Sequence, residues 1–518
     1  MKKCSKKNLI LLSLTLFSMF FGAGNLIFPP FLGQNAGTQS LPALIGFLIT
    51  AVGFPVLGIA VVSRFNGLDV LAQKVHAGFG LFFAVLIYLS IGPLLATPRT
   101  ATLPFEMAIL PLLPESTSPQ LSLLLFTSIF FLIAWLLSRN PSKLIDRLGK
   151  LLTPTLLVLI VTVFAAALMH PLGQPALPQP DYASGPLIKG FLEGYLTMDA
   201  LAALNFGIVV SLNIRALGID DDQEVMSTSM KAGCLAGLIL AVIYIMLTLL
   251  GTSLSGMPIG ANGAQTLTLA VTSLFGESGR WVMALIFLLA CMTTSVGLLT
   301  SCSEFFSSLT PKINYSQWLL FLTLFALGVS NFGLSAILSI SVPVLNMIYP
   351  MALVLILLGL GDPLYRDNRL IYPLTVFSTG VVSVLTELDT LGLRIPGLTQ
   401  LLENLPLASQ SLSWICVAIA MFGLSLIKRL QAGAGPMAWL GDGSTRDFFL
   451  ELTEGAAAPG SSHIAFVTEC RELWYAKHSA AGLIDEEIAG LGIYFLHDPD
   501  GNRIEVMPAG ALNVLAGQ

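Results

Sequence analysis

The sequence predicts an all-α polytopic membrane protein of about twelve transmembrane helices, followed by a small C-terminal α+β segment. Three observations lead to this fold class. Of the 518 residues, 55% are hydrophobic and only 11% are charged, whereas about 25% of the residues of a typical soluble domain are charged. The mean hydropathy is +0.82. Finally, a series of apolar stretches runs from the N-terminus to residue 430, and the composition changes after it.

Each apolar stretch is long enough to be a transmembrane helix, which needs about 20 predominantly apolar residues. The shortest gap separates the ninth stretch from the tenth. We expect spans at 8–28, 41–62, 79–103, 119–138, 148–169, 187–212, 231–252, 279–306, 317–337, 339–360, 370–387 and 411–427.

Lysine and arginine residues predict the orientation of these spans, because the cytoplasmic loops of membrane proteins are enriched in them. If the N-terminus is cytoplasmic, the cytoplasmic loops contain Arg64, Lys74, Arg139, Lys143, Arg147, Lys150, Arg215, Lys231, Lys312, Arg366, Arg369, Lys428 and Arg429. The opposite loops hold little beyond Arg280 and Arg394, with Lys189 at the edge of a span. We therefore expect an even number of spans and both termini in the cytoplasm.

The first span contains helix-breaking residues before it ends. Gly22-Ala23-Gly24 precedes Asn25, and Pro29-Pro30 follows. In hydrocarbon, irregular backbone is tolerated only where it lines a cavity or is packed within protein. We interpret this stretch as an unwound segment whose carbonyls face a cation and whose amides face a carboxylate. Close helix packing through small residues is an alternative, and a signal peptide is another interpretation of the basic start and the apolar run.

A second interrupted span, the sixth, favours the unwound interpretation. Its residues 190–210, "GFLEGYLTMDALAALNFGIVV", include Gly194, Asp199, Asn205 and Gly207. It stands five spans after the first, as a five-plus-five repeat requires, and matched breaks in two repeats mark the binding site of a transporter. An acid inside a span is a functional candidate. The alternative for Asp199 is a structural hydrogen bond to a neighbouring helix.

Polar residues in spans eight and three complete the set of candidates. Thr293, Thr294 and Ser295 are consecutive hydroxyls that point about 100° apart on a helix, so one or two could offer oxygens to a hard cation such as Na⁺. Bonding to carbonyls of the preceding turn is the alternative. In span three, Arg99 lies towards the outer end, where it could pair with an acid or extend to the interface. We do not assign Arg99 to substrate binding.

These motifs together resemble a known transporter family. Five segments occur in order between residues 8 and 430, at matching depths: "GAGNLIFPP", "GPLLATPRTAT", "GYLTMDALAALNFGIVV", "SVGLL…CSEFF" and "SVPVLNMIYP". They closely resemble the bacterial branched-chain amino acid:cation symporter family. The resemblance implies uptake of leucine, isoleucine and valine by alternating access in the bacterial inner membrane, coupled to Na⁺, with H⁺ as the alternative ion. It also implies the five-plus-five inverted repeat of the amino acid–polyamine–organocation superfamily, with two extra helices.

The same resemblance implies positions for the site. The superfamily binds substrate at the unwound parts of spans one and six, which match Gly22, Ala23, Gly24, Asn25, Leu196, Thr197 and Asp199. Its shared sodium site matches carbonyls near Ser18 and Phe21, with Ala290, Thr293 and Thr294 from span eight. An aliphatic side chain needs an apolar pocket, for which Phe20, Phe21 and Phe206 are available.

The composition changes after residue 430, so we expect a transporter domain at 1–430 and a cytoplasmic α+β segment at 431–518. From residue 431 onward, four basic residues stand against twelve acids. Alternating runs at 448–452, 463–467, 492–496 and 503–507 predict strands. A helical stretch lies between the second and third runs, and the "DPDG" turn precedes the last run.

This segment resembles part of the vicinal-oxygen-chelate (glyoxalase-like) superfamily. "SSHIAFV…GIYFLHDPDGNRIEVM" resembles its second βαβββ module, and "MAWLGDGSTRDFFLELTEG" resembles the last strands of its first module. The superfamily's metal ligands match His463 and Glu505, with Glu451 from the preceding module. A histidine and two carboxylates suit a divalent metal. However, the first strand, helix and second strand of the first module, with its histidine, are absent.

Three classes of function compete. A cation-coupled symporter is favoured, with an amino acid as substrate, the lipid bilayer as surroundings and no nucleic-acid partner. A membrane-anchored metal-binding module or metalloenzyme of the glyoxalase-like type would need a complete C-terminal domain. A channel would need polar residues along a continuous pore, whereas here they gather at two matched breaks. We therefore predict a transporter and not an enzyme.

Overall fold

The computed structural model describes most of the chain between residues 4 and 508. The chain forms two compact units, Met1–Leu360 with Thr379–Trp414, and Gly361–Ser378 with Ile415–Gln518. The residues outside the description are 1–3, 66, 111–112, 115–116, 141–151, 220, 261, 366–367, 394–401, 403, 432–436, 441–447, 454–462, 469–470, 481, 483, 489–492, 498–502 and 509–518.

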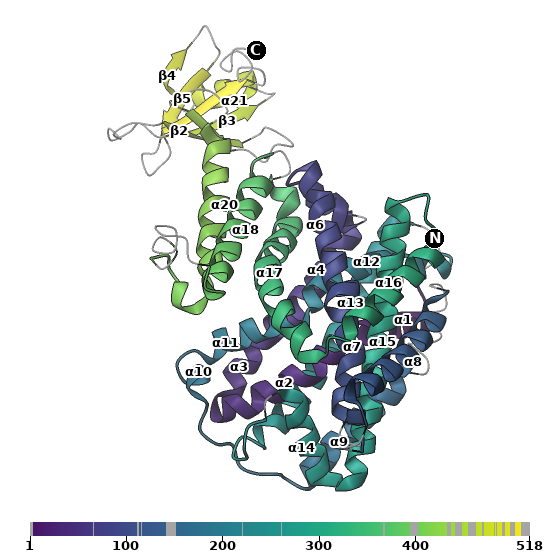
Figure 1. Ribbon diagram of the computed structural model, residues 1–518. Coiled ribbons are helices and arrows are strands. Elements are labelled where there is room, and N and C mark those ends of the chain that lie inside the picture. The colour runs from purple at the N-terminus through teal and green to yellow at the C-terminus, as the bar shows by residue number, and fades with distance from the viewer. Residues whose placement is uncertain are drawn as a thin grey trace. The chain divides into compact units, whose positions relative to one another are not determined.

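Most of the described chain is helical (Figure 1). Several helices begin at ordinary capping signals; for example, the Asp221 carboxylate accepts from the backbone N–H of Glu224 at the start of α13. The helices are α1 Lys6–Phe20, α2 Ala23–Ala36, α3 Ser40–Leu48, α4 Phe54–Phe65, α5 Leu68–Gln73, α6 Ala77–Leu89, α7 Ala96–Pro104, α8 Pro119–Ser138, α9 Thr153–Met169, α10 Pro180–Ala183, α11 Pro186–Glu193, α12 Asp199–Ala216, α13 Asp222–Thr252, α14 Gly263–Phe275, α15 Glu277–Leu309, α16 Tyr315–Ser330, α17 Leu334–Tyr365, α18 Ile371–Thr390, α20 Ser413–Gln431 and α21 Arg471–Ala480.

Apolar helices long enough to cross a membrane dominate this set. By length and hydropathy, seven described helices qualify, or eight if the bent pair within α12 counts as one span. Three shorter apolar helices overlap other predicted spans: Thr153–Met169, Tyr315–Ser330 and Ser413–Leu426. The chain is thus a multi-pass membrane protein. The count of twelve spans stays a prediction.

One predicted boundary is wrong. The ninth and tenth spans were expected to separate near residue 338, but α16 ends at Ser330 and α17 begins at Leu334. The turn lies at 331–333 because Gly333 adopts a φ of +86°, which glycine tolerates best. The Glu106 carboxylate accepts from the Leu334 backbone N–H at 2.9 Å, so it satisfies a donor that the start of α17 leaves free.

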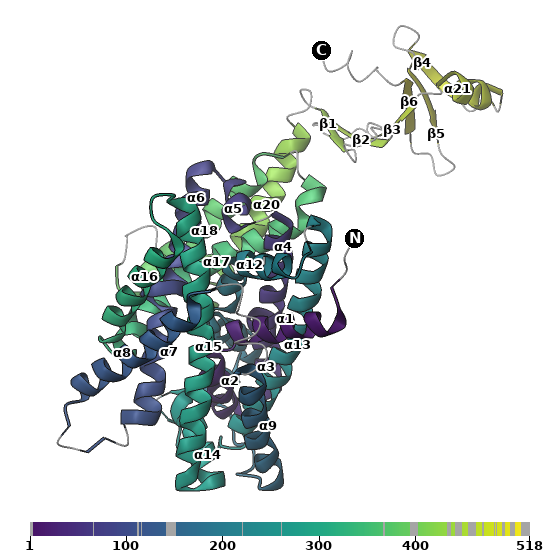
Figure 2. The ribbon, with the colours of Figure 1, turned by 90° about the vertical axis from the view of Figure 1, so that its right-hand side faces the viewer.

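Helix α2, which continues the first span after its break, packs closely against α13 (Figure 2). Glycines permit the approach, since a Cβ at Gly251 would lie 1.9 Å from the Pro30 carbonyl oxygen and one at Gly33 would lie 2.1 Å from that of Thr248. Pro29 and Pro30 belong to the interior of α2, although the sequence suggested that they extend the break. Packed membrane helices tolerate proline because neighbouring groups satisfy the freed backbone.

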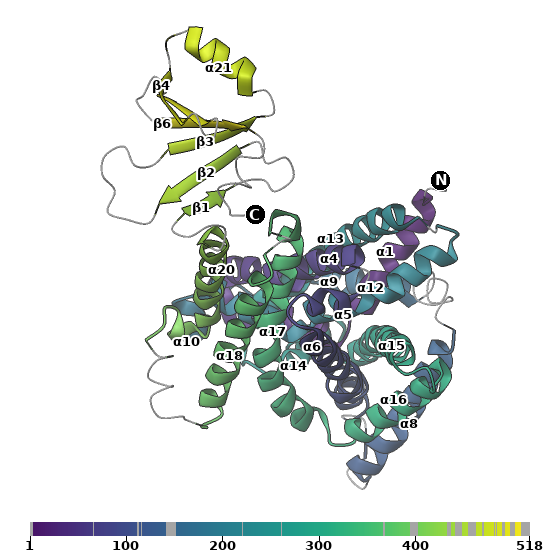
Figure 3. The ribbon, with the colours of Figure 1, turned by 90° about the horizontal axis from the view of Figure 1, so that it is seen from above.

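Helix α15 contacts α7, α8, α12 and α16, and it is seen end-on in Figure 3. Many of its buried residues are small or hydroxyl-bearing, among them Thr293, Ser295, Thr300, Ser301 and Ser303. Small residues let membrane helices approach closely, and hydroxyls bond across or along them. This helix therefore brings polar side chains into the interior of the first unit. Helix α14, which connects α13 to α15, is an additional short helix that the span prediction does not contain.

The C-terminal part of the second unit contains a six-stranded sheet with the order β1-β2-β3-β6-β5-β4 (Figure 3). Only the β3–β6 pair is parallel. The four predicted alternating runs coincide with β2, β3, β5 and β6. Helix α21 contacts the sheet through Tyr475 and His478, both against the buried Tyr494. The strands are β1 Met437–Leu440, β2 Phe448–Thr453, β3 His463–Thr468, β4 Ile484–Ile488, β5 Ile493–His497 and β6 Arg503–Pro508.

Candidate functional site

The first span is broken where glycines occur. Helix α1 ends at Phe20, and α2 begins at Ala23. Between them Gly22 is extended, with φ −123° and ψ −151°. The predicted break is confirmed and is confined to two residues, so Ala23, Gly24 and Asn25 form the first turn of α2 instead of an unwound strand. The backbone N–H groups of this turn have no partner within the helix.

The sixth span is also broken, as predicted. Helix α11 ends at Glu193, a 3₁₀ turn follows over Gly194–Thr197, and α12 begins at Asp199. The residue between them, Met198, adopts the left-handed conformation with φ 66° and ψ 9°. Two helices thus start within the bundle, α2 after the first break and α12 after the second. The N-terminus of each carries a partial positive charge.

A closed set of side-chain hydrogen bonds joins the two breaks. The Asn25 amide nitrogen donates to Asp199 Oδ2 at 2.6 Å and also to the Tyr244 hydroxyl. The Tyr244 hydroxyl donates to the same Asp199 oxygen at 2.8 Å. Asn25 Oδ1 accepts from the Gly22 backbone N–H at 3.2 Å. All three side chains are buried. This network therefore fixes the start of α2 against the start of α12, and both against the interior of α13.

Aromatic packing holds Tyr244 in place. Its ring centroid lies 5.3 Å from that of Phe47, edge to face, and 6.5 Å from that of Phe21. Phe21 stacks in turn on Phe17 at 5.1 Å. Such contacts orient the ring and leave the hydroxyl to bond to Asp199. The residue adjacent to the first break, Phe21, therefore positions the network through its side chain.

A third break, in span three, brings Arg99 to the same place. The helix is interrupted between α6 and α7, where Gly92 has φ −88° and ψ −124°. Arg99, on α7, is 4% exposed. Both of its terminal nitrogens donate to the Leu196 carbonyl oxygen of the second break, each at 3.4 Å. The sequence placed Arg99 near the outer end of its span, but the structure places it in the interior beside the two breaks.

Of the residues predicted for a cation site, Ser18 of α1 and Thr294 of α15 are in contact. The Thr294 hydroxyl donates to the Ser18 carbonyl oxygen at 3.3 Å. The Thr293 hydroxyl donates to the Ala290 carbonyl oxygen at 2.9 Å, which is the back-bonding alternative. Ser18, Phe21, Ala290 and Thr293 are fully buried. A Cβ at Gly22 would lie 2.6 Å from Thr294 Oγ1, so glycine is needed for this close approach.

A hollow lies where the three breaks meet, and it combines charged, hydroxyl and apolar groups. Six of the seven predicted substrate residues line it, and Leu196, the seventh, points its carbonyl oxygen to Arg99. Of the predicted cation residues only Thr294 lines it. Phe20 contributes an apolar wall, and Phe206 packs behind Phe20 with centroids 5.3 Å apart. The lining residues are Met19, Phe20, Gly22, Ala23, Gly24, Asn25, Ile91, Ala96, Arg99, Thr100, Thr197, Met198, Asp199, Ala202, Thr294 and Leu298.

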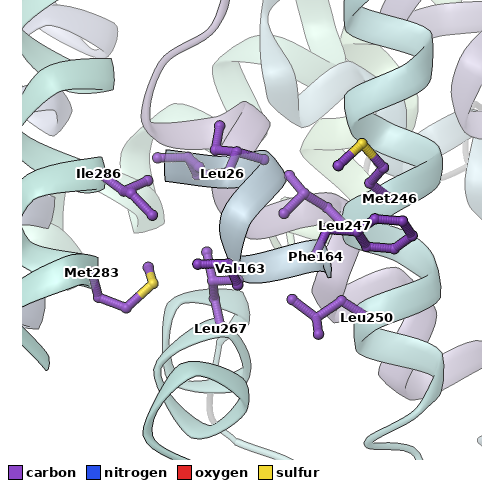
Figure 4. A pocket seen from close by; sticks show the side chains of 10 residues that line it. Leu26, Val163, Phe164, Met246, Leu247, Leu250, Leu267, Met283 and Ile286 are labelled. Carbon is purple, nitrogen blue, oxygen red and sulfur yellow. The ribbon is translucent and has the colours of Figure 1, made fainter. Parts of the chain in front are cut away.

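A second hollow, between α2, α9, α13, α14 and α15, differs in chemistry (Figure 4). Its lining consists of aliphatic, aromatic and methionine side chains, and Figure 4 shows no nitrogen or oxygen on the side chains drawn. A charged group placed there would have no partner, which is costly in an apolar environment. The hollow at the breaks is therefore the candidate for a zwitterionic ligand.

Sequence reasoning gave no role to four residues that form or support this site. Arg99 was noticed but not assigned, and Met198 lay inside the predicted segment without a role. Tyr244 and Tyr349 were not noticed. A tyrosine inside an apolar span is a weak signal, since its hydroxyl needs a partner when buried. The Tyr349 hydroxyl accepts from the Ala200 backbone N–H at 3.2 Å, so it caps the first turn of α12.

The residues predicted to bind a divalent metal lie in neighbouring strands of the C-terminal sheet. Glu451 of β2 is paired with His463 of β3, and Glu505 of β6 is paired with Ala465, two residues further along β3. Their side chains lie outside the described part of the chain. The described residues contain no cluster of three metal-ligating side chains. The metal site stays a prediction.

Comparisons with known proteins identify the family. Residues 5–431 match the family described as "Branched-chain amino acid transport protein". The branched-chain amino acid permease BraB of Bacillus subtilis (strain 168) is 42% identical over 418 residues, which cover 80% of this chain and 93% of the permease.

Two solved structures share the fold. Mhp1, a nucleobase-cation-symport-1 family transporter in a closed conformation with bromovinylhydantoin bound, has a TM-score of 0.54 at 13% identity, covering 81% of this chain and 91% of Mhp1. MhsT in complex with L-phenylalanine has a TM-score of 0.50 at 14% identity, covering 82% of this chain and 99% of MhsT. The chain therefore belongs to the branched-chain amino acid transport protein family, and it is a transporter rather than an enzyme.

Proposed function

We propose that the protein is a secondary active symporter that takes up leucine, isoleucine and valine with Na⁺ by alternating access, with H⁺ as the alternative coupling ion. The observation that carries the proposal is the meeting of two broken helices around one hollow lined by Asn25, Asp199 and Thr294. Breaks at matched positions of two repeats mark the substrate and ion sites of transporters with inverted repeats.

The hollow suits an aliphatic amino acid. Asp199 supplies a negative charge for an ammonium group, and the N-termini of α2 and α12 present backbone N–H groups and partial positive charge for a carboxylate. Apolar side chains such as Ile91, Ala202 and Leu298 line the rest and suit a branched side chain. Relatives named as branched-chain amino acid permeases support this class of substrate.

The oxygen atoms that α1 and α15 offer as ligands suit a hard cation. They are the Ser18 and Ala290 carbonyl oxygens and the hydroxyls of Thr293 and Thr294, and alkali and alkaline-earth cations prefer such oxygen ligands. A bound Na⁺ would supply positive charge next to the first break. The chain's own residues would hold it by exchanging their present hydrogen bonds for bonds to the ion.

The architecture that we propose is a five-plus-five inverted repeat within twelve spans, with two extra helices. The breaks in spans one and six support it, as do the two fold relatives. We further propose a bacterial inner-membrane location with both termini in the cytoplasm, which the distribution of lysine and arginine supports.

Uptake of labelled leucine into proteoliposomes tests the proposal. Inward Na⁺ and H⁺ gradients are imposed separately, and an ionophore that dissipates the imposed gradient is the control. Concentrative uptake with an inward Na⁺ gradient is expected, and uptake with the H⁺ gradient alone would assign the other ion. Leucine equilibration that neither gradient accelerates would contradict symport, and the absence of any uptake would contradict the substrate class.

Thr294→Ala tests the cation site. Loss of the hydroxyl removes one oxygen ligand, so the Na⁺ concentration for half-maximal uptake is expected to rise about tenfold, equivalent to about 1.4 kcal/mol. Asn25→Ala is expected to lower uptake and weaken the cation dependence as well, because Asn25 fixes the adjacent break.

Thr162→Ala is the matched control for this variant. The Thr162 hydroxyl bonds to the Val158 carbonyl oxygen of its own helix at 2.8 Å, and Thr162 is exposed. Its Na⁺ titration should equal that of the wild type. A folded Thr294→Ala protein with an unchanged titration would place the coupling cation elsewhere.

The C-terminal segment is proposed to be separate from transport, with Glu451, His463 and Glu505 as a partial metal site. The family match ends at residue 431, and α20 ends at Gln431. A chain that stops after residue 431 is therefore expected to keep leucine uptake within about twofold of the full-length protein. Loss of uptake by a truncated protein that remains folded and inserted would favour the alternative, in which the spans serve the C-terminal module.

A further inference from the structure

Arg99 is a buried cation whose hydrogen bonds are incomplete. Its two terminal nitrogens share one acceptor, the Leu196 carbonyl oxygen, at the long distance of 3.4 Å each. Its Nε has no partner among the described residues. The Phe28 ring lies under the guanidinium, with its centroid 6.0 Å away. A guanidinium offers five N–H donors in a planar fork, and one shared carbonyl leaves most of that capacity unused.

No carboxylate of the described part of the chain forms a direct ion pair with Arg99. The Lys189 ammonium, by contrast, lies 3.6 Å from a carboxylate oxygen of Asp181 and 3.6 Å from one of Glu193. The nearest acid of the site, Asp199, is already bonded to Asn25 and Tyr244. A buried charge without a paired counter-ion is strongly unfavourable, and an ionisable residue at this depth of a membrane bundle usually marks a substrate or ion pathway. Asp199 thus acts on Arg99 only across the hollow, and the guanidinium keeps N–H donors for an anion that binds there.

The guanidinium lies in the lining of the hollow that the two breaks form. Arg99 and Asp199 both line it. Gly24 is the lining residue next to Arg99, and a Cβ there would lie 2.9 Å from Arg99 Nη2. Glycine at position 24 thus lets the guanidinium approach the first turn of α2, where backbone N–H groups are also free to bind an anion. Planar, bidentate pairing with a carboxylate is the interaction that an arginine makes best.

We propose that Arg99 is a substrate-binding residue that pairs with the α-carboxylate of the transported amino acid, across the hollow from Asp199. This inference rests on the proposed function and deepens it, because a cation and an anion in one hollow match the two charges of a zwitterion. The site then selects for the carboxylate as well as for the aliphatic chain. Amines of the same shape that lack a carboxylate leave Arg99 unpaired and are rejected.

Competition binding to the purified full-length protein in Na⁺-containing detergent buffer tests the assignment. Labelled leucine is displaced by unlabelled leucine or by 3-methylbutylamine, which is leucine without its carboxylate. In the wild type the amine is expected to bind at least about 100-fold more weakly than leucine. In Arg99→Gln, leucine should weaken about 100-fold and the amine should change little, so that the ratio of the two affinities collapses.

Two further variants keep the test decisive if Arg99→Gln does not fold. Arg99→Lys retains the charge but loses the fork, so leucine is expected to weaken about tenfold with the amine unchanged. Gly24→Ala places a methyl group against the guanidinium. It is also expected to weaken leucine binding and to leave amine binding unchanged. Gly328→Ala is the matched control, since a Cβ there meets nothing within 4 Å, and it should keep the wild-type ratio.

The outcomes separate this inference from the function on which it rests. A folded Arg99→Gln or Arg99→Lys protein that keeps the wild-type ratio of leucine to amine affinity would overturn the inference alone, because a residue that only supports the Leu196 carbonyl weakens both ligands equally. Failure of the wild type to bind any branched-chain amino acid would overturn both the function and the inference. Collapse of the ratio in the Arg99 variants, with the wild-type ratio kept in Gly328→Ala, supports the assignment.

Discussion

The two broken spans end at the same hollow, yet they are interrupted in different ways. In span one the backbone at Gly22 is extended, and glycine is needed there for space beside Thr294. In span six the break falls on Met198, whose φ of 66° is costly for a residue with a side chain. One break therefore results from residue type, whereas the other is imposed on an unfavourable residue by its surroundings.

The surroundings of the second break supply bonds to the backbone groups that it frees. Arg99 donates to the Leu196 carbonyl oxygen, and the Tyr349 hydroxyl accepts from the Ala200 N–H. The Thr197 hydroxyl donates to the Gly194 carbonyl oxygen at 2.9 Å. Strained backbone persists at functional sites when neighbouring groups over-determine it. The comparison teaches that a break without glycine at its centre depends on neighbours from other helices.

Asp199→Asn is expected to have the largest effect, because Asp199 joins both breaks and carries the charge. An asparagine side-chain oxygen could still accept from Asn25 and Tyr244, so both breaks should persist, with an unfolding free energy within about 2 kcal/mol of the wild type. Loss of the charge should lower leucine uptake about 100-fold, since bonds to charged groups are worth about 1.5–3 kcal/mol. Transport kinetics and thermal unfolding measure the two effects.

Asp221→Asn provides the control for this prediction. Asp221 is an exposed N-cap of α13, and asparagine caps helices as well as aspartate does. Its uptake should match that of the wild type. If Asp199→Asn transports leucine within about threefold of the wild type, the acid is only a structural partner, and the two breaks need no charge between them.

The difference between the breaks also explains how far the sequence could predict them. Gly22 stands out because it begins a run of small residues that is followed by Asn25 and two prolines, and Asp199 stands out because an acid is rare inside an apolar span. Met198 does not stand out, because its conformation follows from groups on other helices. The position of span one's break was therefore predictable from its own residues, whereas the mechanism of span six's break was not.

Residues that act through tertiary contacts escaped prediction for the same reason. Arg99 was placed towards the outer end of its span because that span was predicted to end at residue 103. The helical segment continues to Ile109 after the interruption at Gly92. Tyr244 and Tyr349 look like packing residues until their partners are known. The boundary near residue 338 failed because hydropathy is continuous there, and the turn at Gly333 depends on a single φ angle.

Gly22→Ala is expected to have the second largest effect, and it tests whether the first break depends on space alone. The new Cβ would lie 2.6 Å from Thr294 Oγ1 and 2.9 Å from Thr294 Cβ, so the threonine must move. Such overpacking costs about 1–3 kcal/mol. Because Thr294 moves away from the Ser18 carbonyl, the Na⁺ concentration for half-maximal uptake should rise about tenfold.

Gly328→Ala in α16 is again the matched glycine variant, and it should leave the titration unchanged. Equal Na⁺ titrations for Gly22→Ala and the wild type would show that the bundle absorbs the extra methyl group. In that case the first break would not depend on glycine. The two breaks would then not differ in the way proposed, with one caused by residue type and the other imposed by neighbouring helices.

Tyr349→Phe is expected to have the smallest effect, and it should act on only one of the two breaks. The ring stacks on Tyr195 with centroids 4.5 Å apart, and phenylalanine keeps this contact. Only the acceptor for the Ala200 N–H at 3.2 Å is lost, which costs about 1 kcal/mol because that donor is buried. Leucine uptake should fall by roughly two- to fivefold.

Hydrogen exchange measured by mass spectrometry locates this effect within the molecule. Peptides that cover residues 198–202 should exchange faster in Tyr349→Phe than in the wild type, because the first turn of α12 loses a bond that its own helix cannot replace. Peptides that cover residues 21–25 should be unchanged, since the Gly22 N–H bonds to Asn25 within its own segment. Equal acceleration at both breaks would mean that they open together, and that span one depends on neighbouring helices as much as span six does.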